Sequence, residues 1–173
     1  MRTFPRRVLL TFVLTVLGGT LLHFVYDFFP NAITAVFSPV SESLWEHTKI
    51  IYWPYLIALL VLTRNGEYGG HAPWLLTLLI LCAVMLAVGY CYHIVLGGES
   101  VAIDIAFYVL LIAAGFLLPR LLRPLAGKPL LTTTLWALVL ALGVVLILFT
   151  RRPPHGMLFV DLSAVRTWIT IPF

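Results

Sequence analysis

Charged residues are scarce in this sequence. Lys, Arg, Asp and Glu together make up 10% of its 173 residues, whereas hydrophobic residues make up 61% and the mean hydropathy is +1.04. A soluble domain of this length needs far more polar surface to cover its core. The composition therefore excludes an ordinary soluble enzyme and predicts one domain, residues 1–173, whose solvent is lipid.

Cysteine is also scarce, with only two residues, Cys82 and Cys91, in one hydrophobic run. Nine residues of helix separate them by about 13 Å along the axis, which is too far for a disulfide. The net charge of +4 comes from short basic clusters between hydrophobic runs. That distribution is typical of membrane topology, and it excludes nucleic acid as a partner.

Five hydrophobic runs are present: Val8–Phe29, Leu44–Thr63, Trp74–Leu96, Val101–Leu118 and Leu130–Phe149. Each is close to the roughly 20 residues that cross about 30 Å of hydrocarbon. In lipid the backbone must satisfy its own hydrogen bonds, so each run is predicted to be a helix. The predicted fold is an all-α, polytopic membrane bundle of five transmembrane helices, with a short helical or re-entrant element between the first two.

The basic residues predict the orientation of this bundle in the cell (inner) membrane. On five spans, one side holds Arg2, Arg6, Arg7, Arg64, Arg120, Arg123 and Lys128, and the other holds Lys49, Arg151, Arg152 and Arg166. Cytoplasmic segments carry the excess of Lys and Arg. We therefore expect a cytoplasmic N-terminus and an extracytoplasmic C-terminus.

The acidic residues and histidines are distributed unevenly on this topology. All but one of the seven acidic residues and all but one of the five histidines fall at the outer end. They are His23, Asp27, Glu42, Glu46, His47, His93, Glu99, Asp104, His155 and Asp161. Ionisable groups at membrane depth are costly and usually functional. The distribution indicates a polar site at the extracytoplasmic end of the bundle.

The segment from residue 37 to 49, FSPVSESLWEHTK, contains the highest density of these groups. Its Ser-Pro pair at 38–39 predicts a helix start, with the hydroxyl at the N-cap and proline in the first turn. On such a helix Glu42, Glu46 and Lys49 share one face, and His47 points about 100° away from Glu46. One interpretation is an ion-paired helix head at the membrane surface; the other is a buried site.

Three blocks of the sequence carry a family resemblance: HFVYDFFP from residue 23, the segment at 37–49, and PPHGMLF from residue 153. They resemble an uncharacterised family of small prokaryotic integral membrane proteins with H-F-x-Y and F-x-P-V-N-E-S-x-W-E-H-x-K blocks. Ser41 and Met157 depart from that pattern. The resemblance implies the same topology and the same polar residues, and it implies no reaction.

Histidines and carboxylates gathered at one end of a bundle suit zinc, which takes three protein ligands and one open position in catalytic sites. The candidate ligands are His23, His47, His93 and His155, and the candidate general bases are Glu42 and Glu46. The candidate supporting residues are Asp27, Ser43, Lys49, Asp104 and Asp161. No H-E-x-x-H spacing is present, so the ligands have to converge from separate helices. The predicted function is a metal-dependent hydrolase acting on a lipid or other amphipathic substrate.

Two alternatives remain open on the sequence. One is a non-catalytic accessory or binding subunit of a membrane complex, and the other is a b-type haem protein that uses a pair such as His23 and His93. The expected partners are membrane lipids, together with a second copy of the chain or another membrane subunit. We also expect an extracytoplasmic tail, residues 153–173, to pack on the bundle. Its segment Pro153–Asp161 should fold back over the outer end, because the hydrophobic strip from Met157 to Val160 gains by burial.

Overall fold

The computed structural model of the protein describes residues 5–164, and this part of the chain is all-helical, with no strand. Its six α-helices are α1 (Arg6–Phe28), α2 (Thr34–Phe37), α3 (Leu44–Thr63), α4 (His71–Gly89), α5 (Val101–Leu121) and α6 (Pro129–Arg151). A π-helical turn, η2 (Tyr90–Val95), extends α4. The all-α class and the short helix between the first two long ones agree with the sequence prediction.

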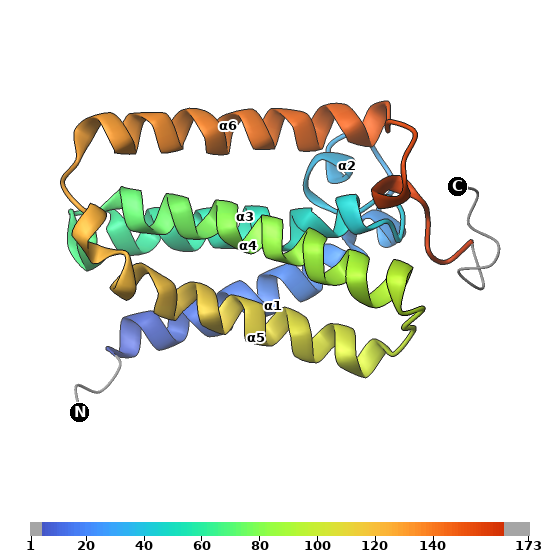
Figure 1. Cartoon of the computed structure of the whole chain (residues 1–173), viewed down its shortest axis with the longest axis horizontal. Coiled ribbons are helices and arrows are strands. Elements are labelled where there is room, and N and C mark those ends of the chain that lie inside the picture. The colour runs from blue at the N-terminus through green and yellow to red at the C-terminus, as the bar shows by residue number, and fades with distance from the viewer. Residues whose placement is uncertain (1–4, 165–173) are drawn as a thin grey trace.

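The five long helices run side by side along the long axis of the molecule, and α2 lies at one end (Figure 1). Within residues 5–164, four stretches are long and apolar enough to cross a membrane: Arg6–Phe28, His71–Val95, Val101–Leu121 and Pro129–Arg151. Helix α3 is not among them, because its first turns carry Glu46, His47 and Lys49. The structure thus supports a membrane protein, while the count of five spans stays a prediction.

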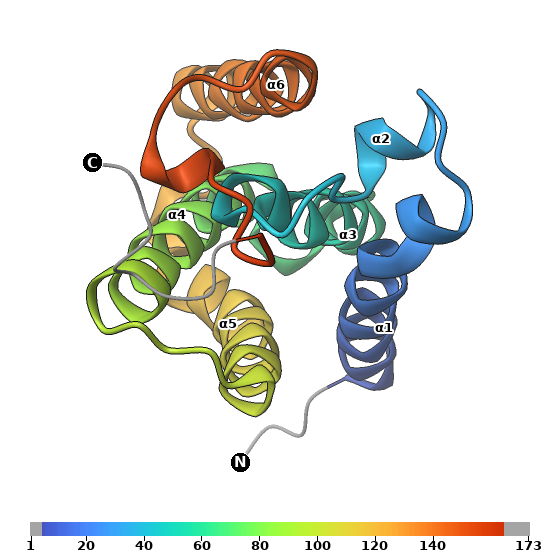
Figure 2. The ribbon, with the colours of Figure 1, turned by 90° about the vertical axis from the view of Figure 1, so that its right-hand side faces the viewer.

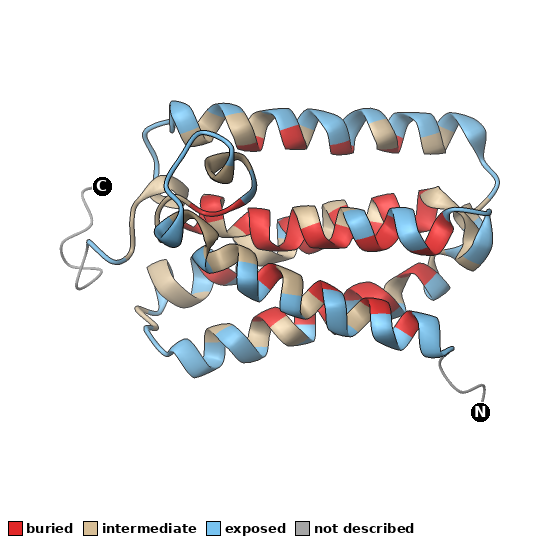
Figure 3. Ribbon diagram, turned by 180° about the vertical axis from the view of Figure 1, so that it is seen from behind, coloured by how far each residue is buried: buried red, intermediate tan, exposed pale blue. Residues whose placement is uncertain are grey.

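Helix α3 occupies the centre of the bundle, with the other long helices around it (Figures 2 and 3). Thirteen of its 20 residues are buried. The hydroxyl of Tyr52 donates to the Val139 carbonyl of α6 at 2.9 Å, and that of Tyr55 donates to the Gly115 carbonyl of α5. Residues 44–49 are buried or half-buried, so the polar first turns of α3 face protein instead of lipid.

Helices α1, α3 and α5 approach one another closely at Gly19. Pro54 has no N–H, so the Ile50 carbonyl lacks its usual helical donor. That carbonyl and the Tyr108 hydroxyl lie where a Cβ on residue 19 would stand, so only glycine fits there. The Tyr108 hydroxyl donates to the Val16 carbonyl at 3.1 Å and so joins α5 to α1.

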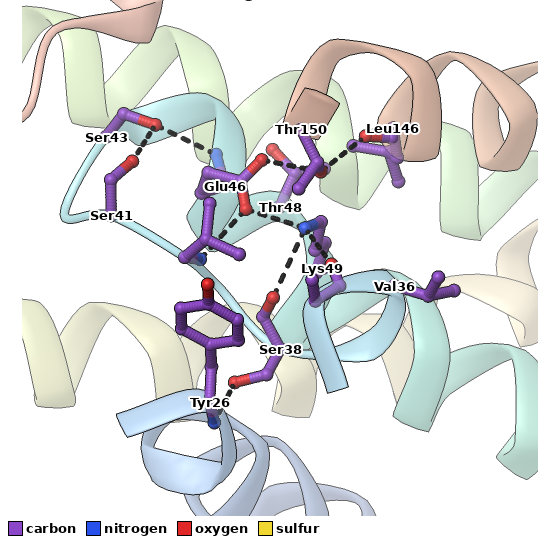
Figure 4. A network of polar contacts seen from close by, with 12 residues as sticks. Tyr26, Val36, Ser38, Ser41, Ser43, Glu46, Thr48, Lys49, Leu146 and Thr150 are labelled. Atoms are coloured by element: carbon purple, nitrogen blue, oxygen red, sulfur yellow. Dashed lines mark hydrogen bonds and ion pairs between the residues drawn. The ribbon is translucent and has the colours of Figure 1, made fainter. Parts of the chain in front are cut away.

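Helix α3 begins later than the sequence suggested. We expected its N-cap at Ser38, whereas the helix starts at Leu44 and Ser43 is the cap, with the Glu46 N–H donating to the Ser43 hydroxyl at 3.3 Å. Ser38 instead joins α1: its hydroxyl accepts from the Tyr26 N–H at 3.0 Å and donates to the Leu22 carbonyl (Figure 4). Because the Ser38 hydroxyl makes both of these hydrogen bonds to α1, it does not cap a helix. Residues 38–43 form a loop instead.

A buried ion pair connects this loop to the core. The Lys49 ammonium lies 2.6 Å from Glu46 Oε2, and the two side chains are 0% and 5% exposed. Lys49 also donates to the carbonyls of Ala35, at 2.8 Å, and Ser38, at 3.2 Å. All three ammonium protons therefore have an acceptor, as a buried charge requires.

The carboxylate of the pair is equally well satisfied (Figure 4). Glu46 Oε2 accepts from the Val40 N–H at 3.0 Å, and Glu46 Oε1 accepts from the Thr150 hydroxyl of α6 at 2.8 Å. The network thus fastens α2, the loop 38–43, α3 and α6 to one another.

The chain after α6 folds back over the same end of the bundle. In its short turn η4 (Met157–Phe159), the Phe159 ring lies 5.2 Å from that of Trp45 and 5.6 Å from that of Phe149. Further on, the Leu162 N–H donates to the Glu42 carbonyl at 3.4 Å. Residues 165–173 of the predicted tail lie outside the described residues.

Neutralising the buried carboxylate should destabilise the protein much more than neutralising an exposed one. Glu46→Gln leaves the Lys49 ammonium buried without a counter-charge, so we expect the free energy of unfolding to fall by about 3–5 kcal/mol. Glu67→Gln is the matched control, because Glu67 pairs with Arg7 at 2.8 Å while both side chains are more than 40% exposed. There we expect a loss of less than about 1 kcal/mol. Unfolding in detergent with increasing denaturant measures both, and equal losses would contradict a structural role for the pair.

Candidate functional site

A cavity of about 590 Å³ lies among α1, α3, η2 and α5, at the end of the bundle where α3 begins. Its walls combine hydrophobic side chains with a group of ionisable residues, which are His23, Glu42, His47, His93, Glu99 and Asp104. The structure thus places three of the four predicted metal ligands in one cavity, together with one of the two predicted general bases.

The tightest group in this cavity is a trio of two histidines and one carboxylate, His23, Glu42 and His47. Their potential ligand atoms all lie within 4.8 Å of one another. Glu42 Oε2 is 3.2 Å from His47 Nε2 and 4.0 Å from His23 Nε2. The three residues come from α1, the loop 38–43 and the first turn of α3, so only the tertiary structure brings them together.

His47 is oriented by the backbone of its own helix. Its Nδ1 lies 2.8 Å from the Ser43 carbonyl, which can only accept, so Nδ1 carries the proton. In the neutral ring the lone pair is therefore on Nε2, and it faces Glu42 Oε2. Either a proton or a metal ion has to lie between these two atoms. Metal-binding histidines commonly hold their other nitrogen in this way.

The ring of His23 lies against the rings of Phe24 and His47. It stacks on the Phe24 ring at 4.9 Å and meets the His47 ring edge-on at 5.0 Å. Its Nδ1 is buried and makes no hydrogen bond within the described part of the chain. A polar nitrogen in this state needs a further partner.

Glu42 precedes α3 and is half-exposed. The hydrogen bond from His47 holds the pKa of this carboxyl below its ordinary value of 4.5, against partial burial, and the nearby imidazoles act in the same direction. Glu42 is consequently an anion at neutral pH, as a metal ligand should be.

A second pair lies on the other wall of the cavity. His93, in the π-helical turn η2, places Nε2 3.1 Å from Asp104 Oδ1 on α5, and its Nδ1 lies 2.8 Å from the Gly98 carbonyl. The carbonyl fixes the proton on Nδ1, so in the neutral ring the Nε2 lone pair faces the Asp104 carboxylate, and a proton taken up between them would be held by both. Such a pair can accept a proton from water and return it.

Other predicted site residues lie outside this cavity. Glu46 points into the core and pairs with Lys49, so it stands apart from the histidines. Ser43 caps α3. Their positions follow from the late start of α3, which separates Glu42 on the loop from Glu46 on the helix.

His155 is exposed and does not line the cavity, and the same holds for Asp27. Asp161 accepts from the hydroxyl of Ser163 at 2.7 Å within the tail. Instead of His155, the tail contributes Leu162 and Ser163 to the cavity wall.

Two further titratable residues line the cavity without having been proposed as site residues from the sequence, Glu99 and Tyr108. Tyr108 stands one helical turn after Asp104, so helical periodicity could have suggested it. Glu99 lies in the short loop before α5, and its place depends on how that loop turns. No sequence signal marks Leu162 or Ser163.

The trio matches the donor chemistry of zinc, which binds imidazole nitrogen and carboxylate oxygen. Ligands about 2.0–2.1 Å from a tetrahedral zinc lie about 3.3 Å apart. One of the observed separations, 3.2 Å, already has this value, and another, 4.0 Å, exceeds it by a fraction of an ångström. All three separations lie within 4.8 Å, so side-chain rotations that shorten the longer ones would let the trio hold one zinc ion.

The sequence matches the model of one protein family, described as Family of unknown function (DUF6512), over residues 3–168. No similar curated protein and no similar solved structure was found. The chemistry of the site is therefore inferred from its geometry.

Removing a member of the trio should remove zinc binding. We expect wild-type protein to hold one zinc per chain, and His47→Ala or His23→Ala to weaken binding by at least about 100-fold. The controls are His155→Ala, exposed on the tail, and His71→Ala, whose ring packs on Trp136 at 5.7 Å. Both should bind zinc as the wild type does. Titration calorimetry and elemental analysis measure this, and zinc lost in a control but kept in His47→Ala would contradict the assignment.

Proposed function

The chain belongs to the DUF6512 family of unknown function, and we propose that it is a membrane-embedded, zinc-dependent hydrolase acting on a lipid or other amphipathic substrate. The observation that carries this proposal is the trio His23, Glu42 and His47 in a largely hydrophobic cavity. A metal ligand set beside hydrophobic walls suits a substrate that has both a polar reacting bond and an apolar chain.

In this proposal the chain forms one transmembrane domain of five spans. Helix α3 has 20 residues, about 30 Å of helix, and packs alongside α1 and α4. A bundle whose outer helices cross the membrane therefore carries α3 across with them. The N-terminus is cytoplasmic and the cavity opens at the extracytoplasmic end.

Zinc held by the trio would supply a bound water of lowered pKa and would polarise the substrate carbonyl. The protein residues direct the rest of the reaction. His47 is held by the Ser43 carbonyl, and His23 and Glu42 complete the ligand set. In this arrangement Glu42 is a ligand and cannot also be the general base.

We assign the general base to the pair of Asp104 and His93. As the water oxygen bonds to the acyl carbon, the pair takes the water proton. When the bond from that carbon to the leaving oxygen or nitrogen breaks, the same proton passes to the leaving group. One water is consumed, and the products are a carboxylic acid and an alcohol or amine. Glu46 has no part, because Lys49 neutralises it in the core.

The haem alternative fits this geometry less well. Both ring nitrogens of His93 are already engaged, by Gly98 and by Asp104, so iron coordination would have to break one of these contacts. The accessory-subunit alternative differs from the hydrolase only in turnover, so an activity measurement separates the two.

Labelling of single cysteines tests the five-span topology. In a Cys91→Ser background, which leaves only the buried Cys82, we expect Ala32→Cys, in the exposed turn between α1 and α3, to react with an impermeant maleimide on intact cells. Asn65→Cys, in the turn after α3, should react only after permeabilisation. Labelling of both positions from the same side would refute five spans, and the reverse pattern would refute the orientation.

Loss of the proposed base should abolish turnover without loss of metal. On a set of long-chain acyl esters and amides, we expect Asp104→Asn to lower kcat by about 10²–10⁴-fold while zinc stays at one per chain. The matched control is Asp27→Asn, an exposed carboxylate near the same end of the bundle that does not line the cavity, and it should keep wild-type activity. If zinc-loaded wild type hydrolyses nothing in the set, the accessory-subunit role is favoured.

A further inference from the structure

The cavity reaches the side of the bundle between α1 and α5. On these two helices, four of its lining residues are exposed: Thr20 and Phe24 on α1, and Val101 and Ile105 on α5. Three of these four side chains are hydrophobic, and Val101 is 68% exposed. We call these exposed edges of the cavity, one on α1 and one on α5, its two lips. Because both lips lie on membrane helices, the cavity opens toward lipid acyl chains as well as toward water.

The opening ends at Tyr108, deeper in the bundle. This side chain is 7% exposed, and its hydroxyl bonds to the carbonyls of Thr15 and Val16 on α1. Further inward the rings of Phe12 and Phe116 meet edge-on at 5.5 Å. The gap between α1 and α5 is thus closed in the inner half of the bundle and open in the outer half.

The charges around the cavity disfavour an amphiphilic ligand with an anionic head group. Three carboxylates line it, on Glu42, Glu99 and Asp104, and no Lys or Arg does so among the described residues. The nearest basic group on α3, Lys49, is fully buried in its own ion pair. Even with a zinc ion on the trio, three carboxylates against two positive charges leave the lining net negative, so a phosphate or carboxylate head would be disfavoured there relative to an uncharged or amine-bearing head.

We infer that the ligand is a long-chain amphiphile with a non-anionic head, and that it enters sideways from the membrane between α1 and α5. The inference deepens the proposed function, because it names the substrate class of the same site. A volume of about 590 Å³ is in the range of small-molecule sites. It holds the head and the first part of the chain, with Tyr108 as the floor, while the rest of the chain lies in the bilayer between the two lips.

Photolabelling in vesicles of neutral phospholipid tests this inference without turnover. Three probes share one long alkyl chain with a diazirine near the head, and the head is an ethanolamide, a primary amine or a carboxylate. We expect the first two to label residues of the cavity wall, chiefly Phe24, Ile105 and Tyr108. The carboxylate probe should label them at least tenfold less.

Blocking variants test the path of entry. Thr20→Trp and Ile105→Trp fill the two lips, and each should reduce cavity labelling at least tenfold. Their matched controls are Leu21→Trp and Ile103→Trp, neighbouring exposed residues that do not line the cavity, and labelling there should stay at the wild-type level. Since all four positions are exposed, none of these variants disturbs the core.

Carrying out the labelling with and without zinc separates this inference from the proposed function. Selective cavity labelling in a protein that fails to bind zinc would sustain the lateral site and refute the metal assignment. Equal labelling by all three heads, labelling scattered over the outer surface, or labelling unaffected by both lip variants would overturn the inference, even if zinc binds.

Discussion

The buried ion pair of Lys49 and Glu46 is the interaction on which the site depends. Its hydrogen bonds reach α2, the loop 38–43 and α6, so it fixes where the loop runs and how α3 is rotated. Because His47 follows Glu46 on the same helix, turning Glu46 into the core turns His47 about 100° away, toward α1. The loop, held at its other side by Ser38, then brings Glu42 to His47. A structural network and a candidate metal site thus share one short segment.

This arrangement also accounts for the composition of α3. A helix at the centre of a bundle can carry charged residues in its first turns only if each charge is paired, because neighbouring helices exclude water. The structure meets this condition in two ways. Glu46 and Lys49 neutralise one another within the core, whereas His47 faces the cavity and pairs with the half-exposed Glu42. The first pair is buried too deeply for chemistry, and the second is accessible to a ligand.

Much of the fold could be predicted from the sequence, because hydrophobic length is a local property of the chain. The run Leu44–Thr63 coincides with α3, and the other four long helices differ from their predicted bounds by at most three residues at either end once η2 is counted with α4. The start of α3 was placed wrongly as a continuous helix from Ser38. A Ser-Pro pair signals a helix end only when its hydroxyl has no better partner, and here α1 provides one. Such a preference depends on tertiary structure, which the local sequence does not contain.

The same distinction applies to the site. The number of hydrophobic runs gives the topology of the chain. The topology in turn places four of the site residues at one end of the bundle: His23, Glu42, His47 and His93. Glu46 turns away from them because of the rotation of α3. His155 stays exposed, and Leu162 lines the cavity instead, because of the path of the tail. Neither the rotation nor the path is a periodic property, so neither could be predicted from spacing.

The central claim is that His23, Glu42 and His47 hold a zinc ion. X-ray absorption at the zinc edge of the purified, zinc-loaded protein tests it most directly, because it reports the atoms bound to the metal irrespective of activity. If these three residues hold zinc, the spectrum shows four ligands at about 2.0–2.1 Å, with the scattering pattern of two imidazoles and the remainder oxygen. A spectrum with no imidazole scattering, with sulfur, or with six oxygen ligands would contradict it.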